Sequence, residues 1–348
     1  MKNHLTELPN KILVGNDVIE ESGSFLKKLN FSGKVLIISG QTHTIPIKKK
    51  LIQILESEGF QVSSDVVNST TLEEVNKIVD KSKKEIASVI IGLGGGKTDV
   101  AKLASHKVGI PFVNIPTSGS HDGIASPFAS IKNLERAYSY LAKPPIGILA
   151  DINIITNAPK KLLVSGCGDL VSKITAIKDW MLARDEVKEY YGQYAANLAR
   201  LSAEIILSES ELIGKGGIES TRMIVEALIS SGVAAGIAGS SRPCSGSEHL
   251  FSHALDIVAP SIGLHGEKCA LGTIMMMKLH GLDWQKAKES FEKMNIPTKA
   301  QEIGLSKEQV IKALIKAPST RPERYTILNK IELDDISANE LAKSTGII

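Results

Sequence analysis

The stretch SVIIGLGGGKTDVAK, residues 88–102, decides the fold of this chain. A short β-branched run leads into three consecutive glycines, Gly94, Gly95 and Gly96, and then directly into a helical pattern. Glycines allow a backbone to approach a phosphate closely, and a helix N-terminus offers free N–H groups and the positive end of a dipole. The stretch therefore predicts a strand-to-helix turn that binds a diphosphate; a tight turn that binds nothing is the alternative.

Two well-known phosphate loops do not match this turn. A P-loop requires a glycine five residues before Gly96, and that position holds Ile91. A Rossmann GxGxxG motif is expected after the first strand, whereas this cluster follows roughly the third. Asp99 lies in the first helical turn, where a favourable interaction with the helix dipole is its simplest role.

Short apolar runs alternate with amphipathic helical stretches around this turn. The predicted strands are 34–40, 61–67, 88–96 and 111–118, and the helices between and after them are 45–60, 72–86 and 97–109. This order predicts a doubly wound parallel sheet. Beyond about residue 160 nearly all of the sequence has helical patterning, as in 173–207, 219–239, 269–294 and 307–317. We expect a Rossmann-like α/β domain over residues 1–160, an all-helical domain over 161–348, and a ligand cleft between them.

Composition excludes several classes of protein. The 348 residues exceed what one core usually serves, and 43% hydrophobic with 23% charged residues is ordinary for a soluble enzyme. A net charge of +3 is too small to indicate nucleic-acid binding, and three cysteines cannot build a disulfide framework. The sequence shows no apolar run typical of a membrane span, and its start lacks the apolar core of a signal peptide. A cytoplasmic location is expected.

The segment NIPTSGSHDGIASP, residues 114–127, follows another predicted strand and is rich in polar side chains. It could be an ordinary polar loop. Hydroxyls beside a carboxylate and an imidazole at the carboxyl end of a parallel strand, however, lie where open α/β sheets bind ligands. The functional interpretation is favoured for Thr117, Ser118, Ser120, His121, Asp122 and Ser126.

Three of the eight histidines fall within residues 249–265. His249 and His253 are four residues apart, so a helix projects them from one face. His265 begins a second apolar run after APSIG, where a short connection could fold it back onto the pair. Gathered imidazoles suit a divalent metal, with Zn²⁺ the first candidate, although an HxxxH pair alone is more often fortuitous.

A second unusual segment is SGCGDLVSK, residues 165–173. Its Asp169 precedes a strongly helical run, so taken alone it is best explained as a helix cap. Cys167, Cys244 and Cys269 each lie near one of the residues Asp169, His249 and His265. No CxxC pair is present, and small buried apolar residues are the favoured role for all three cysteines.

Together, GGGKTDVAK, IPTSGSHDGIASP, GCGDL, GSEHLFSHALD and LHGEK, in this order and spacing, resemble the sn-glycerol-1-phosphate dehydrogenases. These belong to the superfamily of glycerol dehydrogenase, iron-type alcohol dehydrogenase and 3-dehydroquinate synthase, and the resemblance covers about residues 10 to 340. It implies a dehydroquinate synthase-like fold and a nicotinamide dinucleotide, NAD(P), bound by two loops. The residues concerned are Gly95, Gly96, Lys97, Thr98, Asp99, Thr117, Ser118, Gly119, Ser120 and Ser126.

The resemblance further implies one catalytic Zn²⁺ per subunit, held by Asp169, His249 and His265. Residues that match Asp122 and His253 face the substrate, and Asp122, His253 and Asp169 form the catalytic set. Iron-type relatives have a histidine four residues after the aspartate, whereas this chain has Lys173, which favours zinc. Three protein ligands leave a coordination position open, as a catalytic zinc requires.

The implied reaction is NAD(P)H-dependent reduction of dihydroxyacetone phosphate to sn-glycerol 1-phosphate, the backbone of ether-type phospholipids. We expect a cytoplasmic homo-oligomer that acts on a small-molecule substrate. Lys173 and Arg242 are candidates for binding the substrate phosphate. No acidic residue follows the predicted strand 34–40, so NADH and NADPH are both expected to serve.

Other functions remain open at this stage. Glycerol dehydrogenase would oxidise unphosphorylated glycerol well. A dehydroquinate synthase-like lyase would share the dinucleotide and the zinc but carries a glutamate as its metal carboxylate. An ATP-dependent kinase or a phosphate-binding protein would respond to nucleoside triphosphate and magnesium instead.

Overall fold

A six-stranded parallel sheet forms the N-terminal half of the computed structural model, which describes residues 5–132 and 137–348. Its strand order is β1-β8-β5-β4-β2-β3. The strands are β1 (Lys11–Gly15), β2 (Lys34–Ser39), β3 (Gln61–Val66), β4 (Val89–Gly94), β5 (Phe112–Pro116) and β8 (Gly147–Asp151). A separate antiparallel hairpin pairs β6 (Phe128–Lys132) with β7 (Ala137–Leu141). The predicted strands from β2 to β5 are confirmed, while β1, β8 and the hairpin were not predicted.

Helices cover both faces of the sheet, as the alternating side chains of β2 demonstrate. Val35 and Ile37 share a core with Leu51 of α2, whereas Leu36 packs in a second core with Val75 of α3. The helices of this α/β region are α1 (Ser22–Lys28), α2 (Ile45–Ser57), α3 (Leu72–Glu85), α4 (Thr98–Val108) and α5 (Ile152–Thr156), with short 3₁₀ turns η1 (Val18–Glu21) and η2 (Asp122–Ile124). The doubly wound architecture is therefore confirmed.

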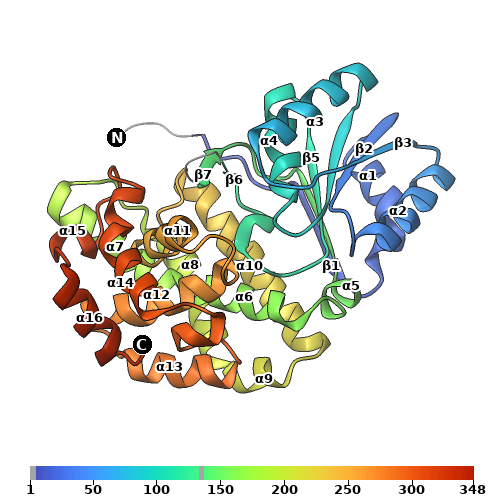
Figure 1. Cartoon of the computed structure of the whole chain (residues 1–348). Coiled ribbons are helices and arrows are strands. Elements are labelled where there is room, and N and C mark those ends of the chain that lie inside the picture. Colours follow the sequence, from blue (N-terminus) through green and yellow to red (C-terminus); the bar gives the residue numbers. More distant parts are fainter. Residues whose placement is uncertain (1–4, 133–136) are drawn as a thin grey trace.

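The rest of the chain is helical and packs beside the β1–β8 side of the sheet (Figure 1). Its elements are α6 (Lys160–Val171), α7 (Lys173–Val187), α8 (Gln193–Ser208), α9 (Ser210–Lys215), α10 (Ile218–Ala238), α11 (Ser247–Val258), α12 (His265–Leu279), α13 (Trp284–Lys293), η3 (Ala300–Ile303), α14 (Lys307–Thr320), α15 (Ile327–Lys330) and α16 (Asp335–Ser344). One apolar core joins this helical region to Ile148 and Ala150 of β8. The two regions therefore share buried contacts along one side of the sheet.

The helical stretch predicted over 173–207 is interrupted in the structure. Lys188 ends α7 in a left-handed conformation, and α8 begins at Gln193. Trp180 explains the break, because its indole N–H donates to the carbonyl oxygen of Tyr190 at 2.6 Å and its ring lies 4.8 Å from that of Tyr191. These tertiary contacts outweigh the helical patterning of the segment.

Helix α10 has the length and hydropathy of a membrane span, with 67% of its most apolar window buried inside the protein. Its buried residues, among them Ile224, Val225 and Leu228, belong to the core of the helical region. The helix therefore has the packing of a central core helix, for which the same apolar composition is needed.

The strand order places the glycine turn at a topological switch point. From β2 the chain adds β3 at one side of the sheet, whereas from β4 it adds β5 on the other side. Open α/β sheets bind ligands in the crevice beyond the carboxyl ends of the strands at such a point. The glycines that follow β4 lie at this crevice, on the side that faces the helical region.

Candidate active site

The two loops predicted to bind the dinucleotide lie against each other. A Cβ added to Gly95 would lie 2.7 Å from Ser118 Oγ, so only glycine allows this approach. The side chain of Lys97 extends in the other direction to Gly40, at the carboxyl end of β2. The glycine turn, the hydroxyl-rich loop and the end of β2 thus form a continuous surface along the strand ends.

Both carboxylate oxygens of Asp99 have hydrogen-bond partners within the protein. Lys102, which is fully buried, donates to Oδ1 at 2.9 Å, and the Ser130 N–H donates to Oδ2 at 2.8 Å. Asp99 borders the cleft, but these bonds tie α4 to β6. The structure therefore gives this carboxylate a structural role.

Asp169 lies near the end of α6, which corrects the prediction that it caps the start of a helix. The glycines before it explain why α6 continues through GCG. A Cβ on Gly166 would clash with the carbonyl oxygen of Gly119, and one on Gly168 would clash with that of Gly266. The glycines let α6 pack against both the hydroxyl-rich loop and the start of α12, which carries Asp169 to the boundary between the two regions.

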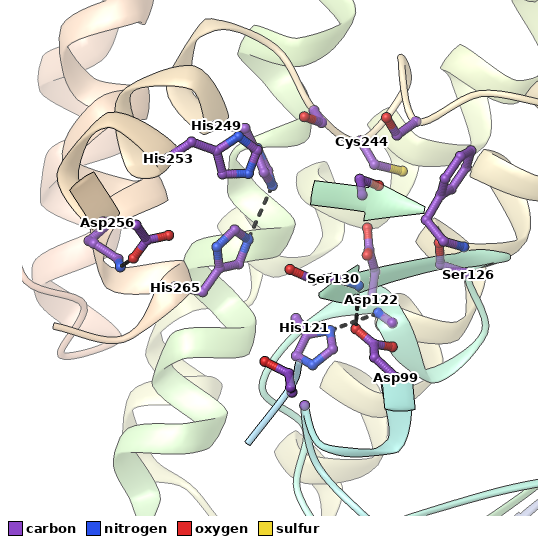
Figure 2. Close-up of a pocket in the computed structure, with 18 of the residues that line it drawn as sticks. Asp99, His121, Asp122, Ser126, Ser130, Cys244, His249, His253, Asp256 and His265 are labelled. Atoms are coloured by element: carbon purple, nitrogen blue, oxygen red, sulfur yellow. Dashed lines mark hydrogen bonds and ion pairs between the residues drawn. The ribbon is translucent and has the colours of Figure 1, made fainter. Parts of the chain in front are cut away.

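The structure brings Asp169, His249 and His265 together. Asp169 Oδ1 lies 3.5 Å from His249 Nε2 and 3.9 Å from His265 Nε2, and the two Nε2 atoms are 3.3 Å apart. Figure 2 shows His249 and His265 converging from α11 and α12. Donors bound at about 2.0–2.2 Å to one tetrahedral ion lie roughly 3.3–3.6 Å from one another. The donor set therefore fits a zinc ion with little rearrangement.

Electrostatics in this cluster favour an ionised Asp169. Burial alone would raise the pKa of Asp169, but the Lys173 ammonium and the neighbouring imidazoles hold it well below its usual range. Burial opposes protonation of His249, yet the charge of Cys269 and hydrogen bonds to Asp169, Cys269 and Glu248 hold its pKa well above 6.5 in the metal-free protein. Protons partly neutralise the negative charge of this cluster. A divalent cation would take the place of those protons on binding.

Glu248 is a site residue that the sequence analysis missed. Its Oε1 lies 2.7 Å from His249 Nδ1, and the buried carboxylate also accepts from Thr175 Oγ1 at 2.7 Å and the Gly246 N–H at 2.7 Å. A carboxylate on the second ring nitrogen fixes the orientation and basicity of a metal-binding histidine. Only its position next to His249 in the sequence could have indicated this role.

Cys269 is the second missed residue. All three cysteines are buried, as predicted, but Cys269 Sγ lies 3.6 Å from His265 Nε2 and within 4.8 Å of the donor atoms of both histidines. Burial raises the pKa of this thiol, while the two imidazoles outweigh that effect and lower it to about 6. An apolar role does not describe Cys269, which lies one helical turn after His265 and adds a sulfur donor to the cluster.

Lys173 and Arg242, the candidates for phosphate binding, are both engaged elsewhere. Lys173 is fully buried, and its Nζ lies 2.7 Å from Asp169 Oδ1 and 3.0 Å from Asp122 Oδ2. The Arg242 guanidinium pairs with Glu189 and also donates to the carbonyl oxygen of Tyr325 at 2.8 Å. The prediction that they bind the substrate phosphate is therefore wrong for both side chains, because their charged groups already form ion pairs and hydrogen bonds with oxygen atoms of the protein.

A cleft of about 360 Å³ joins these parts. Figure 2 shows the histidines of α11 and α12 on one side of it and Asp99, His121 and Asp122 on the other. Asp122 also donates its backbone N–H to Asp169 Oδ2 at 2.9 Å, and its carboxylate accepts from Ser231 Oγ at 3.0 Å. Ser126 and His253, which were also predicted to be site residues, line the same cleft.

Comparison with known proteins gives consistent relatives. Residues 13–159 match the family described as iron-containing alcohol dehydrogenase. The chain is 48% identical to the glycerol-1-phosphate dehydrogenase of Nitrosopumilus maritimus, with 100% of this chain and 98% of that protein covered. The proteins of the same name from Sulfurisphaera tokodaii and Pyrococcus furiosus are each 46% identical, with at least 99% of both chains covered. All three names specify NAD(P)+.

Solved structures agree on the fold. Glycerol dehydrogenase from Schizosaccharomyces pombe has a TM-score of 0.81 at 21% identity, covering 99% of this chain and 91% of that chain. NADH-dependent butanol dehydrogenase A from Thermotoga maritima has a TM-score of 0.75 at 16% identity, covering 100% and 99%. The full-length sequence matches and this shared fold lead to one conclusion: the chain belongs to the glycerol-1-phosphate dehydrogenase family.

Proposed function

We propose that this enzyme reduces dihydroxyacetone phosphate to sn-glycerol 1-phosphate with NADH or NADPH at a zinc ion held by Asp169, His249 and His265. The observation that carries the proposal is the convergence of one carboxylate oxygen and two imidazole nitrogens, from three helices, at mutual distances of 3.3–3.9 Å. The names of the full-length relatives, glycerol-1-phosphate dehydrogenase (NAD(P)+), support this reaction. The product is proposed to supply the glycerol backbone of ether-type phospholipids.

Held by Asp169, His249 and His265, zinc would supply Lewis-acid polarisation of the substrate carbonyl, and bound NAD(P)H would supply the hydride. The chain contributes orientation and charge. We assign the glycine turn, residues 95–99, and the hydroxyl-rich loop, residues 117–120 with Ser126, to the dinucleotide. Ser118 Oγ, buried against Gly95, fixes the spacing between these two loops.

Asp122 and His253 face the substrate in this proposal. One proton must reach the former carbonyl oxygen for each hydride transferred, and both side chains line the cleft that would hold that oxygen. The Lys173 ammonium contacts the carboxylates of both Asp122 and Asp169. It keeps Asp169 as a charged donor atom for the metal.

The direct test is a spectrophotometric assay of purified protein with dihydroxyacetone phosphate and either NADH or NADPH. Activity should be lost on treatment with a chelator and restored by zinc, and chiral analysis should identify sn-glycerol 1-phosphate. Efficient oxidation of unphosphorylated glycerol, without turnover of the phosphorylated ketone, would instead indicate a glycerol dehydrogenase.

Three further features are part of the proposal. We place the boundary between the dinucleotide-binding and the metal-binding domain near residue 160, where α6 begins. The enzyme is proposed to be cytoplasmic and homo-oligomeric, which fractionation and light scattering on the purified protein would test. Both dinucleotides should serve, because Gly40 and Gln41 rather than an acidic residue follow β2.

A further inference from the structure

One wall of the cleft carries a concentration of arginines that the proposed chemistry does not yet use. Arg321, just after α14, lines the cleft together with Ser241 and Ser245, which belong to the loop before α11. Arg324 lies immediately behind this loop and donates to Ser241 Oγ at 2.8 Å and to the carbonyl oxygen of Ser245. Two guanidinium groups therefore border the same short loop.

Arg242 and Arg324, on this wall, differ in their hydrogen-bond partners. Arg242, in the same loop, is paired with Glu189, whereas the two hydrogen bonds given above for Arg324 go to neutral oxygens. Burial and the neighbouring charges of Arg321 and Arg242 lower the pKa of Arg324 to about 9. Burial is the largest cause, repulsion from the two other guanidinium groups adds to it, and Glu189 and Glu248 act in the opposite sense. An anion bound at this wall would offset the repulsion between the guanidinium groups.

Two buried polar atoms on the same wall lack hydrogen-bond partners among the described residues. They are Ser245 Oγ and His253 Nδ1, and both residues line the cleft. Ser245 is only 6% exposed. Buried hydroxyls and imidazole nitrogens are nearly always hydrogen-bonded, so partnerless atoms on residues that line a cleft point to contact with a polar ligand once it binds.

We infer that Arg321, Ser245 and His253 form the subsite for the phosphate group of the substrate, with Arg324 supplying charge from behind. This inference rests on the proposed function and takes the place of the assignment to Lys173 and Arg242. His253 follows His249 by four residues, about 6 Å along the helix axis. Three bonds separate the carbonyl carbon of dihydroxyacetone phosphate from its phosphorus, so one helix can serve both ends of the molecule.

The test is steady-state kinetics of the zinc-loaded enzyme with Arg321→Gln. Loss of a charged hydrogen-bond donor should raise the KM for dihydroxyacetone phosphate roughly ten- to a hundredfold. Reduction of unphosphorylated dihydroxyacetone should keep the wild-type kcat/KM, and the Kd for NADH from fluorescence titration should not change. Arg222→Gln removes the same charge from the exposed face of α10 and serves as the matched control.

Ser245→Ala provides a second variant with no change of charge and should raise the same KM by a smaller factor, roughly three- to tenfold. Inorganic phosphate should inhibit the wild type competitively and Arg321→Gln much more weakly. The subsite is wrong if wild type reduces the phosphorylated ketone and both variants keep its KM, or if Arg321→Gln weakens NADH binding instead. Failure of wild type to turn over that ketone would overturn the proposed function itself.

Discussion

Glu248 and His249 are neighbours in the sequence and partners in space: the Glu248 carboxylate lies 2.7 Å from His249 Nδ1, on the side of the ring opposite the nitrogen that faces Asp169. A single helical turn thus supplies both a metal donor and the group that orients it. The fully buried carboxylate is itself fixed by Thr175 and by the Gly246 N–H. Orientation of the imidazole is therefore established before any metal binds.

Glu248→Gln should weaken zinc binding by roughly ten- to a hundredfold, because the amide is a poorer partner for the His249 N–H than a carboxylate is. Competition with a chromogenic chelator measures this directly. Glu226→Gln, on the exposed face of α10, is the control and should leave zinc affinity unchanged. Equal zinc affinities of the wild type, Glu248→Gln and Glu226→Gln would show that Glu248 does not support the metal site.

The benefit of zinc to thermal stability should increase with pH. The pKa of His249 is raised in the metal-free protein, so its contribution to stability is complete below 6.5 and is lost as pH rises through the folded pKa. Zinc requires the neutral imidazole, and its affinity rises over the same range. The difference in melting temperature between zinc-loaded and chelated protein should therefore widen from about pH 6 to about pH 8. A constant or shrinking difference would contradict this.

Lys173→Met should destabilise the metal-free protein by about 3–5 kcal/mol, because it leaves Asp122 and Asp169 without their buried counter-charge. Denaturant unfolding of the chelated protein measures the loss. Lys330→Met breaks an exposed pair with Glu186 and should cost no more than about 1 kcal/mol. If the two substitutions have similar effects, the buried ion-pair network is not a source of stability.

Gly168→Ala should cost roughly 1–3 kcal/mol in stability and impair zinc retention. The added methyl group would clash with the backbone of Gly266 and move Asp169 away from His265. Gly236→Ala is the matched helical control, since its new Cβ would meet only ordinary contacts, from 3.5 Å outward. That control should be neutral or slightly stabilising, so a Gly168→Ala protein that retains zinc and stability would refute the close-packing argument.

The strands β2, β3, β4 and β5 and the helices between them could be predicted from local sequence. Each strand is a short apolar run, and each helix has an amphipathic pattern. The short strands β1 and β8 could not, since only pairing with each other and with β5 defines them. The convergence of His249 with His265 was expected from their spacing, whereas Asp169 in isolation is indistinguishable from a helix cap. Its position depends on a backbone contact between α6 and α12 that local sequence does not encode.

Charged residues were the least predictable part of the site. Lys173 and Arg242 are positively charged and lie near the metal-site motifs in the sequence. Their ion-pair partners Asp122 and Glu189, however, come from distant segments. Arg321 and Arg324 belong to a segment after α14 that carried no recognised motif. Only tertiary structure brings their side chains to the loop before α11.

The most direct measurement is an anomalous-difference map at the zinc absorption edge from a crystal of the zinc-loaded enzyme. The account predicts one peak per chain, within about 2.0–2.2 Å of Asp169 Oδ1, His249 Nε2 and His265 Nε2, at the cleft next to Asp122. A peak elsewhere, or a zinc ion bound without the Asp169 carboxylate, would contradict it.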